Sequence, residues 1–156
     1  MLRIHQNSSD AAGLPTGFLE DVQLVDGSGL SDDTQIFQDA VTWLLADIAG
    51  SEDLAAVRDG LAIAGETGSL RNRYDTTAGE LAGRVAAKTG SLSGIRSLAG
   101  YLQADDGSEV VFSVVVAGPQ VDNSSRADID LLVADLARCG ENLADWNSTD
   151  HDDSLG

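Results

Sequence analysis

The residues of this chain that are best suited to do chemistry lie together in Lys88-Thr89-Gly90-Ser91. Lys88 is the only lysine, and the other eight cationic side chains are arginines. A lysine ammonium is a compact charge whose pKa shifts readily, whereas the planar guanidinium of arginine stays protonated in proteins. The pattern favours a role for Lys88 that arginine could not fill. The alternative is a single lysine that remained by chance.

A phosphate-binding loop is one alternative for this stretch, because Gly83 lies a few residues ahead of Lys88-Thr89. That motif needs glycine directly before the lysine and again six residues before it. Those positions hold Ala87 and Ala82. The stretch also leads into another predicted strand, so it lacks the helix N-terminus that would hold a phosphate. The sequence therefore argues against nucleotide binding.

The composition restricts the class of protein. The 156 residues suffice for one domain with a hydrophobic core. The formal charge is −17, and twenty of the 26 acidic residues are aspartate, which argues against nucleic acid or an anionic membrane as partner. No apolar run is long enough for a membrane span, and Met1–Ser9 lacks the apolar region of a secretory signal. Cys139 is the only cysteine, which excludes an intrachain disulfide. Its place at the end of an apolar helical stripe predicts that it is buried.

The first half of the chain predicts helices and turns. Residues 1–21 are predicted to be a polar lead-in, and Asp26–Ser31 a glycine-dependent turn. A helix is predicted to begin after Asp32, Asp33 or Thr34 and to stop at Gly50, with apolar residues from Ile36 to Ile48 at helical spacing. A shorter helix, capped by Ser51, is predicted to end near Gly60. Ala62–Arg73 has no periodicity and is interpreted as a shaped loop.

The second half predicts a three-strand antiparallel meander with residues 84–89, 95–104 and 110–117 as strands, and an Asp-Gly turn at Asp105–Ser108. Val110–Ala117 is apolar at nearly every position, which predicts an interior strand covered on both faces. A last helix is expected from Ser124 or Ser125 to Gly140, with Ile129, Leu132, Val133, Leu136 and Cys139 on one stripe. Residues 141–156 are predicted to be an acidic, disordered tail. Helices, then strands, then a covering helix indicate an α+β fold.

Three segments in this order resemble a known enzyme family: Leu24–Ser31, Ala64–Leu70 with Arg73, and Ala87–Gly94 with Ala99-Gly-Tyr101. Together they resemble the C-terminal part of the serine-type D-alanyl-D-alanine carboxypeptidases/endopeptidases, which are low-molecular-mass penicillin-binding proteins. The resemblance runs from about Val22 to about Gly140, which defines the expected peptidase segment as residues 22–140. It implies part of a β-lactamase/transpeptidase-like fold, in which the Lys-Thr-Gly strand lies at the edge of a five-stranded sheet.

The resemblance also implies roles for single residues. Lys88 would assist proton transfer and, with Thr89, would recognise the terminal carboxylate of a peptidoglycan stem peptide ending in D-Ala-D-Ala. Gly90 would let that peptide approach the edge strand, and the Ser91 backbone N–H would supply half of an oxyanion hole. The family further implies β-lactams as ligands, a location outside the cytoplasm in the cell envelope, and neither a cofactor nor a metal.

The chain departs from the family pattern in two motifs. No serine is followed three residues later by lysine, and no Ser-x-Asn occurs; the nearest stretch is Asn7–Asp10. His5 and His151 lie in polar termini and receive no role. One hypothesis is therefore a truncated or split gene product that is inactive alone. The other is a non-catalytic module that binds peptidoglycan peptides along the Lys88 strand. In either case the strand Val110–Ala117, without its usual partner, is predicted to favour self-association. The alternative is that residues 1–25 fold back and supply the missing strand, with Val22–Val25 as the best candidate.

Overall fold

The computed structural model describes residues 22–31, 33–74 and 78–143. In chain order the main elements are α2 (Gln38–Gly50), α3 (Ala55–Asp59), β1 (Ala62–Ile63), β2 (Val85–Leu92), β3 (Ile95–Gln103), β4 (Glu109–Ala117) and α4 (Ser125–Cys139). Short 3-10 helices lie at Glu52–Leu54, Gly68–Leu70, Gly79–Leu81 and Gly140–Leu143. The predicted lead-in and the predicted tail from residue 144 onward lie outside the described residues. No helix in the described ranges is both long and apolar enough to cross a bilayer.

The strands form one antiparallel sheet in the order β1-β2-β3-β4, and the predicted α+β class is confirmed. β2, β3 and β4 are the predicted meander. The short β1 pairs only with Ala86 and Ala87, so the predicted loop Ala62–Arg73 supplies an additional strand. β2 continues to Leu92, farther than predicted, because its last residues pair with the start of β3. The predicted turn joins β3 to β4, with Gly107 at a φ of 87°.

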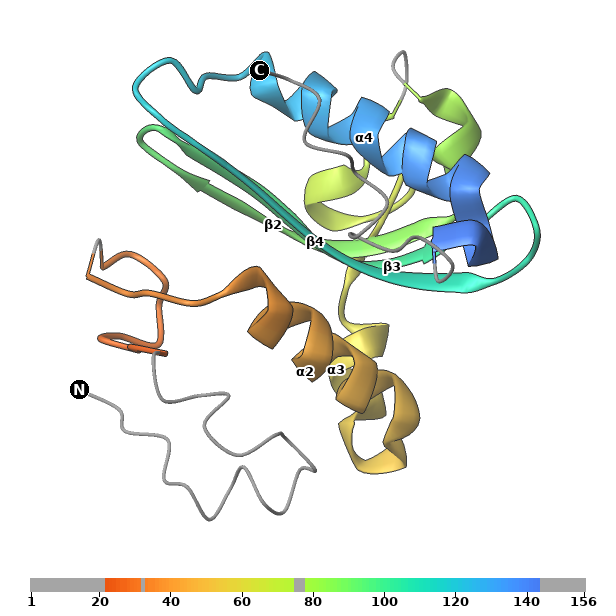
Figure 1. The fold of residues 1–156 in the computed structure, drawn as a ribbon, viewed down its shortest axis with the longest axis horizontal. Coiled ribbons are helices and arrows are strands. Elements are labelled where there is room, and N and C mark those ends of the chain that lie inside the picture. Colours follow the sequence, from red (N-terminus) through yellow and green to blue (C-terminus); the bar gives the residue numbers. More distant parts are fainter. Residues whose placement is uncertain (1–21, 32, 75–77, 144–156) are drawn as a thin grey trace, which may run out of the picture.

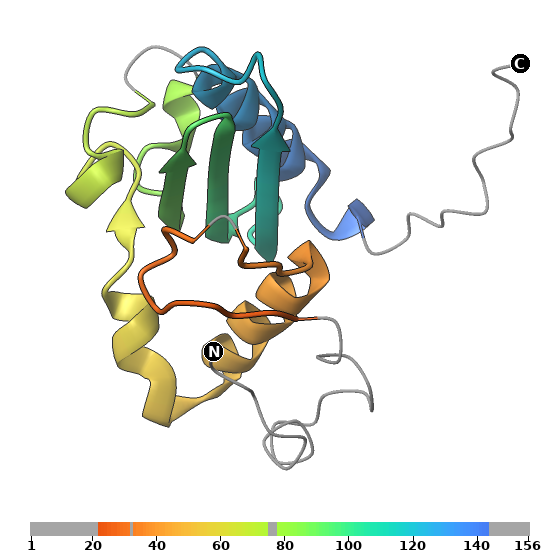
Figure 2. The same ribbon diagram turned by 90° about the vertical axis from the view of Figure 1, so that its left-hand side faces the viewer.

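A helix covers each face of the sheet. Helix α4 packs against β3 and β4 on one face, and α2 packs against the same two strands on the other face (Figures 1 and 2). On the α2 side the Tyr101 hydroxyl donates a hydrogen bond of 2.7 Å to the main-chain oxygen of Leu45. The sheet is therefore the middle of three layers, and each strand residue faces one helix or the other by alternation.

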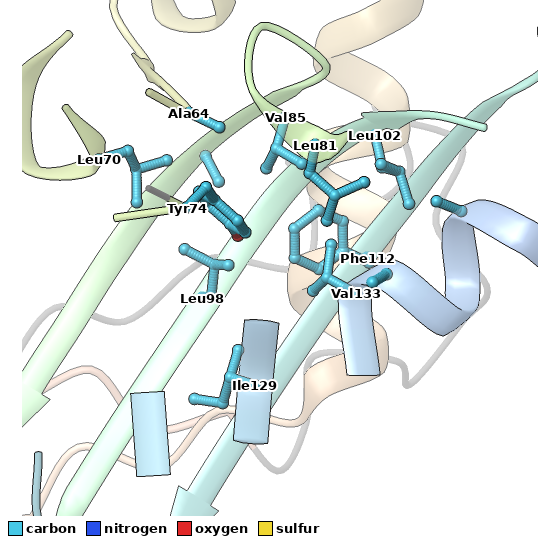
Figure 3. Packing of buried hydrophobic residues seen from close by; sticks show 13 residues of the cluster. Ala64, Leu70, Tyr74, Leu81, Val85, Leu98, Leu102, Phe112, Ile129 and Val133 are labelled. Carbon is cyan, nitrogen blue, oxygen red and sulfur yellow. The ribbon is translucent and has the colours of Figure 1, made fainter. Parts of the chain in front are cut away.

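The hydrophobic core lies on the α4 side (Figure 3). It joins alternate residues of the three long strands to one face of α4 and to two short loops. Its fully buried larger side chains are Leu70, Leu81, Val85, Leu98, Leu102, Ile129 and Val133. Each contributes about 1.5–3 kcal/mol through burial. Gly100 belongs to this face, and a Cβ on it would lie 2.2 Å from the Ala86 carbonyl oxygen, so β2 and β3 can pair closely only with glycine there.

The start of α2 differs from the prediction. The helix begins at Gln38 with Phe37 as its N-cap, and no side chain caps it. Gln35 instead exchanges main-chain hydrogen bonds of 2.8 and 2.9 Å with Gln23, which keeps the chain extended just before the helix. Asp33 and Thr34 therefore do not cap it, and Asp32 lies outside the described residues. Gln23 of the Val22–Val25 run pairs with Gln35, and this run is not a strand of the sheet, so it does not supply the predicted partner of β4. Residues 1–21 lie outside the described residues.

The prediction for β4 was right about its two covered faces and wrong about an interior place among the described strands. β4 is the last strand in the sheet order, with β3 as its neighbour among the described residues. Its continuous apolar sequence reflects the helices above and below it, because Phe112 faces the α4 core while Ser113, on the opposite face, donates a hydrogen bond to Gln38 of α2. The covering is incomplete, and Val115 is 41% exposed.

Helix α4 has the predicted bounds but buries a different stripe. Ile129, Val133, Ala134 and Ala137 face the core, whereas Leu132 is 45% exposed and Cys139 is also exposed. Seven residues make about two helical turns, so Leu132 and Cys139 share a face, and that face points to solvent. The prediction of a buried cysteine was therefore wrong.

Candidate functional site

The second half of β2, which carries the Lys-Thr-Gly triplet, lies at an edge of the sheet. β1 pairs with Ala86 and Ala87 and ends there. From Lys88 to Leu92, β3 is the only strand that pairs with β2 in the part of the chain that the structure describes. The main chain of this segment therefore has one side directed away from the sheet, where an extended peptide could add as another strand.

Neighbouring residues of the triplet lie on opposite faces of the sheet. Lys88 is exposed on the α2 side, opposite Ala99 of β3, and its Nζ donates a 2.7 Å hydrogen bond to the Thr89 carbonyl oxygen. Thr89 lies on the α4 side, and its hydroxyl donates a 3.1 Å hydrogen bond to the Ser69 hydroxyl. The strand therefore presents the ammonium on one face and the hydroxyl on the other.

Gly90 and Ser91 complete the predicted set. A Cβ on Gly90 would lie 2.1 Å from the Ser97 hydroxyl oxygen on β3, so the absence of a side chain at Gly90 makes room for Ser97. Ser91 is exposed and pairs with Arg96 across the hairpin. Gly94, at a φ of 71°, forms the turn between these strands.

A cavity of about 640 Å³ opens beside the triplet on the α4 side. It lies between the loop that follows β1, the end of the β2–β3 hairpin and the first turn of α4. Its lining includes Thr89, Gly90 and Ser91 but not Lys88. The structure thus brings three of the four predicted residues to one cavity and places the fourth on the other face. The remaining lining is Gly68, Ser69, Arg71, Asn72, Arg73, Tyr74, Arg96, Ser97, Asn123, Arg126, Ala127, Ile129 and Asp130.

A buried ion pair fixes the wall of this cavity. Arg73 Nε donates a 2.8 Å hydrogen bond to Asp130 of α4, and the two side chains are 11% and 6% exposed. Burial raises the pKa of the Asp130 carboxyl, and the Arg73 charge opposes that rise. Burial, together with the Asp130 charge, also raises the pKa of the adjacent Tyr74. The pair attaches the Ser69–Tyr74 loop to α4 and so fixes the position from which Ser69 contacts Thr89.

The predicted Asp26–Ser31 turn is present but does not line the cavity. Asp26 accepts hydrogen bonds from the Ser28 hydroxyl at 2.5 Å and from the main-chain N–H groups of Gly29 and Leu30 at 3.1 and 3.2 Å. These bonds, the serine bond foremost, lower the pKa of Asp26. In Figure 1 the turn lies on the α2 side of the sheet.

Several cavity residues were not predicted from the sequence. Arg71, Arg96, Arg126 and Asp130 come from a loop, a strand and a helix that are far apart in the chain. The only feature of the sequence that could have indicated these arginines was the Arg-Asn-Arg spacing around Asn72. Among the described residues, no group of three or more His, Cys, Asp or Glu side chains could hold a metal ion.

Comparison with known proteins identifies the family. The D-Ala-D-Ala carboxypeptidase 3 (S13) family matches residues 13–138. Carboxypeptidase DacB of Mycolicibacterium smegmatis is 40% identical over 124 residues, which make up 76% of this chain and 26% of that protein. Penicillin binding protein 4 (dacB) from Haemophilus influenzae superposes with a TM-score of 0.68 at 28% identity and covers 84% of this chain. The same protein complexed with a novel β-lactam superposes equally well, over 83% of this chain.

These matches cover a limited part of each relative. The chain spans about a quarter of the Mycolicibacterium carboxypeptidase, 26%, and 29% of the Haemophilus protein. The family match and the structural superposition agree, since both lead to the same group of carboxypeptidases. The chain belongs to the D-Ala-D-Ala carboxypeptidase 3 (S13) family.

Proposed function

We propose that this chain is the Lys-Thr-Gly segment of a serine-type D-alanyl-D-alanine carboxypeptidase/endopeptidase that hydrolyses peptidoglycan stem peptides. The observation that carries the proposal is the edge position of Lys88–Leu92 in a chain of the S13 family. The unpaired side of β2 offers main-chain N–H and C=O groups to an extended peptide, which is the means by which a sheet edge binds a strand. The proposed location of such a peptidase is the cell envelope, outside the cytoplasm.

The alternation along β2 gives the four residues complementary roles in this proposal. A peptide at the edge lies between the two faces of the sheet, so Lys88 can reach it from one face and Thr89 from the other. The ammonium and the hydroxyl would bind the terminal D-alanine carboxylate, and Lys88 would also assist proton transfer. Ser91 would direct its backbone N–H at the developing oxyanion. The exposure of Lys88 and Ser91 supports access to both.

The chain alone is proposed to be inactive. Acyl transfer by this family type needs an activated serine, and Lys88, as the only lysine, leaves no Ser-x-x-Lys. We expect no labelled band after incubation of the purified chain with fluorescent penicillin and denaturing electrophoresis. A band that unlabelled drug competes away would contradict this expectation and would reveal a nucleophile among the fifteen serines.

The catalytic role is tested in a chimera. The region of the Mycolicibacterium carboxypeptidase that aligns with this chain is replaced by this chain, and D-alanine release from a peptide ending in D-Ala-D-Ala is measured. Release by the chimera, together with labelling by fluorescent penicillin, supports the proposal. A chimera that is labelled but releases no D-alanine contradicts it. If such a chimera still binds the peptide saturably, the result favours the non-catalytic binding module.

A further inference from the structure

We propose that the cavity on the α4 side contains a separate binding site, formed by Arg71, Arg96 and Arg126, for an oxyanion that carries two or more negative charges. Phosphate groups and dicarboxylates share this chemistry, and the planar guanidinium matches both in a bidentate manner. The inference goes beyond the proposed peptidase function, because that function gives no role to the three arginines. Thr89, Gly90 and Ser91 also line the cavity, whereas Lys88 faces the opposite side of the sheet.

The arginines of the described residues fall into two groups. Outside the cavity, each arginine has a carboxylate partner: Arg58 pairs with Glu109, Arg84 with Asp105, and Arg138 with Glu80 and Asp135. Four further arginines line the cavity, and among them only Arg73 pairs with a carboxylate, that of Asp130. In a chain with a net charge of −17, acidic partners are abundant. Within the described ranges, three arginines without an ion pair at one cavity are therefore an exception.

The hydrogen bonds of these three side chains leave donors available. Arg71 uses its Nε for the Glu66 carbonyl oxygen at 3.3 Å. Arg96 donates Nη1 to the carbonyl oxygens of Leu92 and Ile95, both at 2.7 Å, and Nη2 to Asn123 at 3.3 Å. A guanidinium has five N–H donors, so Arg71 retains four.

Arg126 and Arg96 contribute in different ways. Arg126 is exposed on the first turn of α4, and its side chain has no hydrogen bond or ion pair within the described residues. The Arg96 Nε is buried and has no hydrogen-bond partner in the same set. Carbonyl and amide oxygens orient Arg96 without neutralising it, so its full charge remains available to a ligand.

The local charge favours an anion despite the acidity of the chain. The lining contains four arginines and one carboxylate, Asp130, which Arg73 already neutralises. Asp122 lies nearby, but its carboxylate accepts hydrogen bonds from the Ser124 main-chain nitrogen and hydroxyl at 2.7 and 2.6 Å. Among the causes that lower the pKa of Asp122, the Arg96 charge is the smallest. The cavity is thus a local positive region, where an anion of high charge binds better than one of low charge.

The test follows the arginine Nε–Hε signals in nuclear magnetic resonance spectra of the full chain during titration at constant ionic strength. One titration uses inorganic phosphate, a second uses succinate, and chloride is the reference. We expect saturable shifts for Arg71, Arg96 and Arg126 with a dissociation constant of about 1 mM, because each charge-assisted contact is weak in an open site but three guanidinium groups act on one ligand. Tighter binding of phosphate than of succinate assigns the ligand to phosphate groups, and the reverse order assigns it to carboxylates.

Matched variants separate the site from general charge effects. Arg126→Ala should weaken binding at least tenfold, whereas Arg138→Ala removes the same charge from a paired, exposed arginine and should leave it unchanged. Lys88→Ala should also leave it unchanged, which keeps this result independent of the peptidase proposal. The inference would be overturned by shifts that do not saturate, or by shifts at Arg58 and Arg84 as large as those at the three cavity arginines. Binding of unchanged strength in Arg126→Ala would also overturn it.

Discussion

The two faces of the sheet are built differently. On the α4 face, strands and helix enclose a continuous core in which Leu98, Leu102 and Val133 have no exposed surface. On the α2 face, Ile48 is the only buried residue of the helix. Nearby, Phe37, Leu44 and Val115 are 48%, 52% and 41% exposed. The difference shows that the stability of this chain depends mainly on α4, while the face that carries Lys88 has a loose apolar cover.

The largest expected effect tests this contrast with one substitution on each face. Leu98→Ala removes a buried side chain and leaves a cavity, which should lower the free energy of unfolding by about 2–5 kcal/mol. Leu44→Ala changes an exposed side chain and should alter it by less than about 0.5 kcal/mol. Urea unfolding monitored by circular dichroism measures both. Equal losses would mean that the faces contribute equally and would refute the comparison.

The next effect concerns function on the α2 face. In the active chimera, Lys88→Ala and Lys88→Arg should each lower D-alanine turnover at least tenfold, because arginine keeps the charge but changes its shape and cannot release a proton. Both variants should keep the parent's melting midpoint, since Lys88 is exposed and outside the core. Turnover by Lys88→Arg equal to that of the parent would show that any cation suffices there.

A smaller effect is expected at the outer edge of β4. Among the residues that the structure describes, only β3 pairs with this strand, and an apolar strand with an unpaired edge promotes association. The charge of −17 opposes contact between chains, and salt screens that repulsion. Light scattering should therefore show oligomers that grow as salt rises. Val115→Lys, which places a charge on this strand, should reduce that growth, and a monomer at every salt concentration would contradict the prediction.

The smallest effect lies at the start of α4. Hydrogen bonds from Ser124, above all from its side chain, lower the pKa of Asp122 below 3.8 in the folded protein. The unfolded chain therefore binds the proton first, and the stabilisation by Asp122 is present above about pH 4 and is lost as the pH falls. Asp122→Asn should lower the melting midpoint slightly at pH 7 and leave it unchanged near pH 2. A deficit that persists at pH 2 would assign the effect to the lost shape of the side chain and not to its charge.

The sequence predicted those parts of the fold that local patterns determine. The hairpin turn at Asp105–Ser108 follows from Asp-Gly chemistry, and the end of α4 follows from Gly140, which has a φ of 53°. Both signals act over a few positions. The Lys-Thr-Gly strand was found because its motif is short and continuous. By contrast, β4 was predicted to be interior because it is apolar at nearly every position. Apolar residues indicate that helices cover both faces of a strand, but they do not indicate whether another strand pairs with each of its edges.

The cavity could not be predicted, because its arginines approach one another only after the sheet has formed and α4 has packed against it. Arg71 and Arg126 are separated by most of the sheet in sequence. The separation of Lys88 from Thr89 was predictable in principle, since adjacent residues of a strand point to opposite faces. Cys139 was misplaced because ten residues of helix leave it about 80° from Ile129, on the side away from the buried Val133 and Ala137.

The Arg73–Asp130 pair has a consequence for the order of events during synthesis. The ribosome delivers the Ser69 loop and the Lys-Thr-Gly hairpin well before Asp130 emerges, since synthesis adds about 5–20 residues per second. Until α4 follows, Arg73 has no carboxylate to hold it, and the loop that contacts Thr89 is not fixed. The core face of the sheet and the wall of the cavity are both completed only by a helix made several seconds later. A chain released before Asp130 would keep the Lys-Thr-Gly motif in its sequence and lack the support for its surroundings.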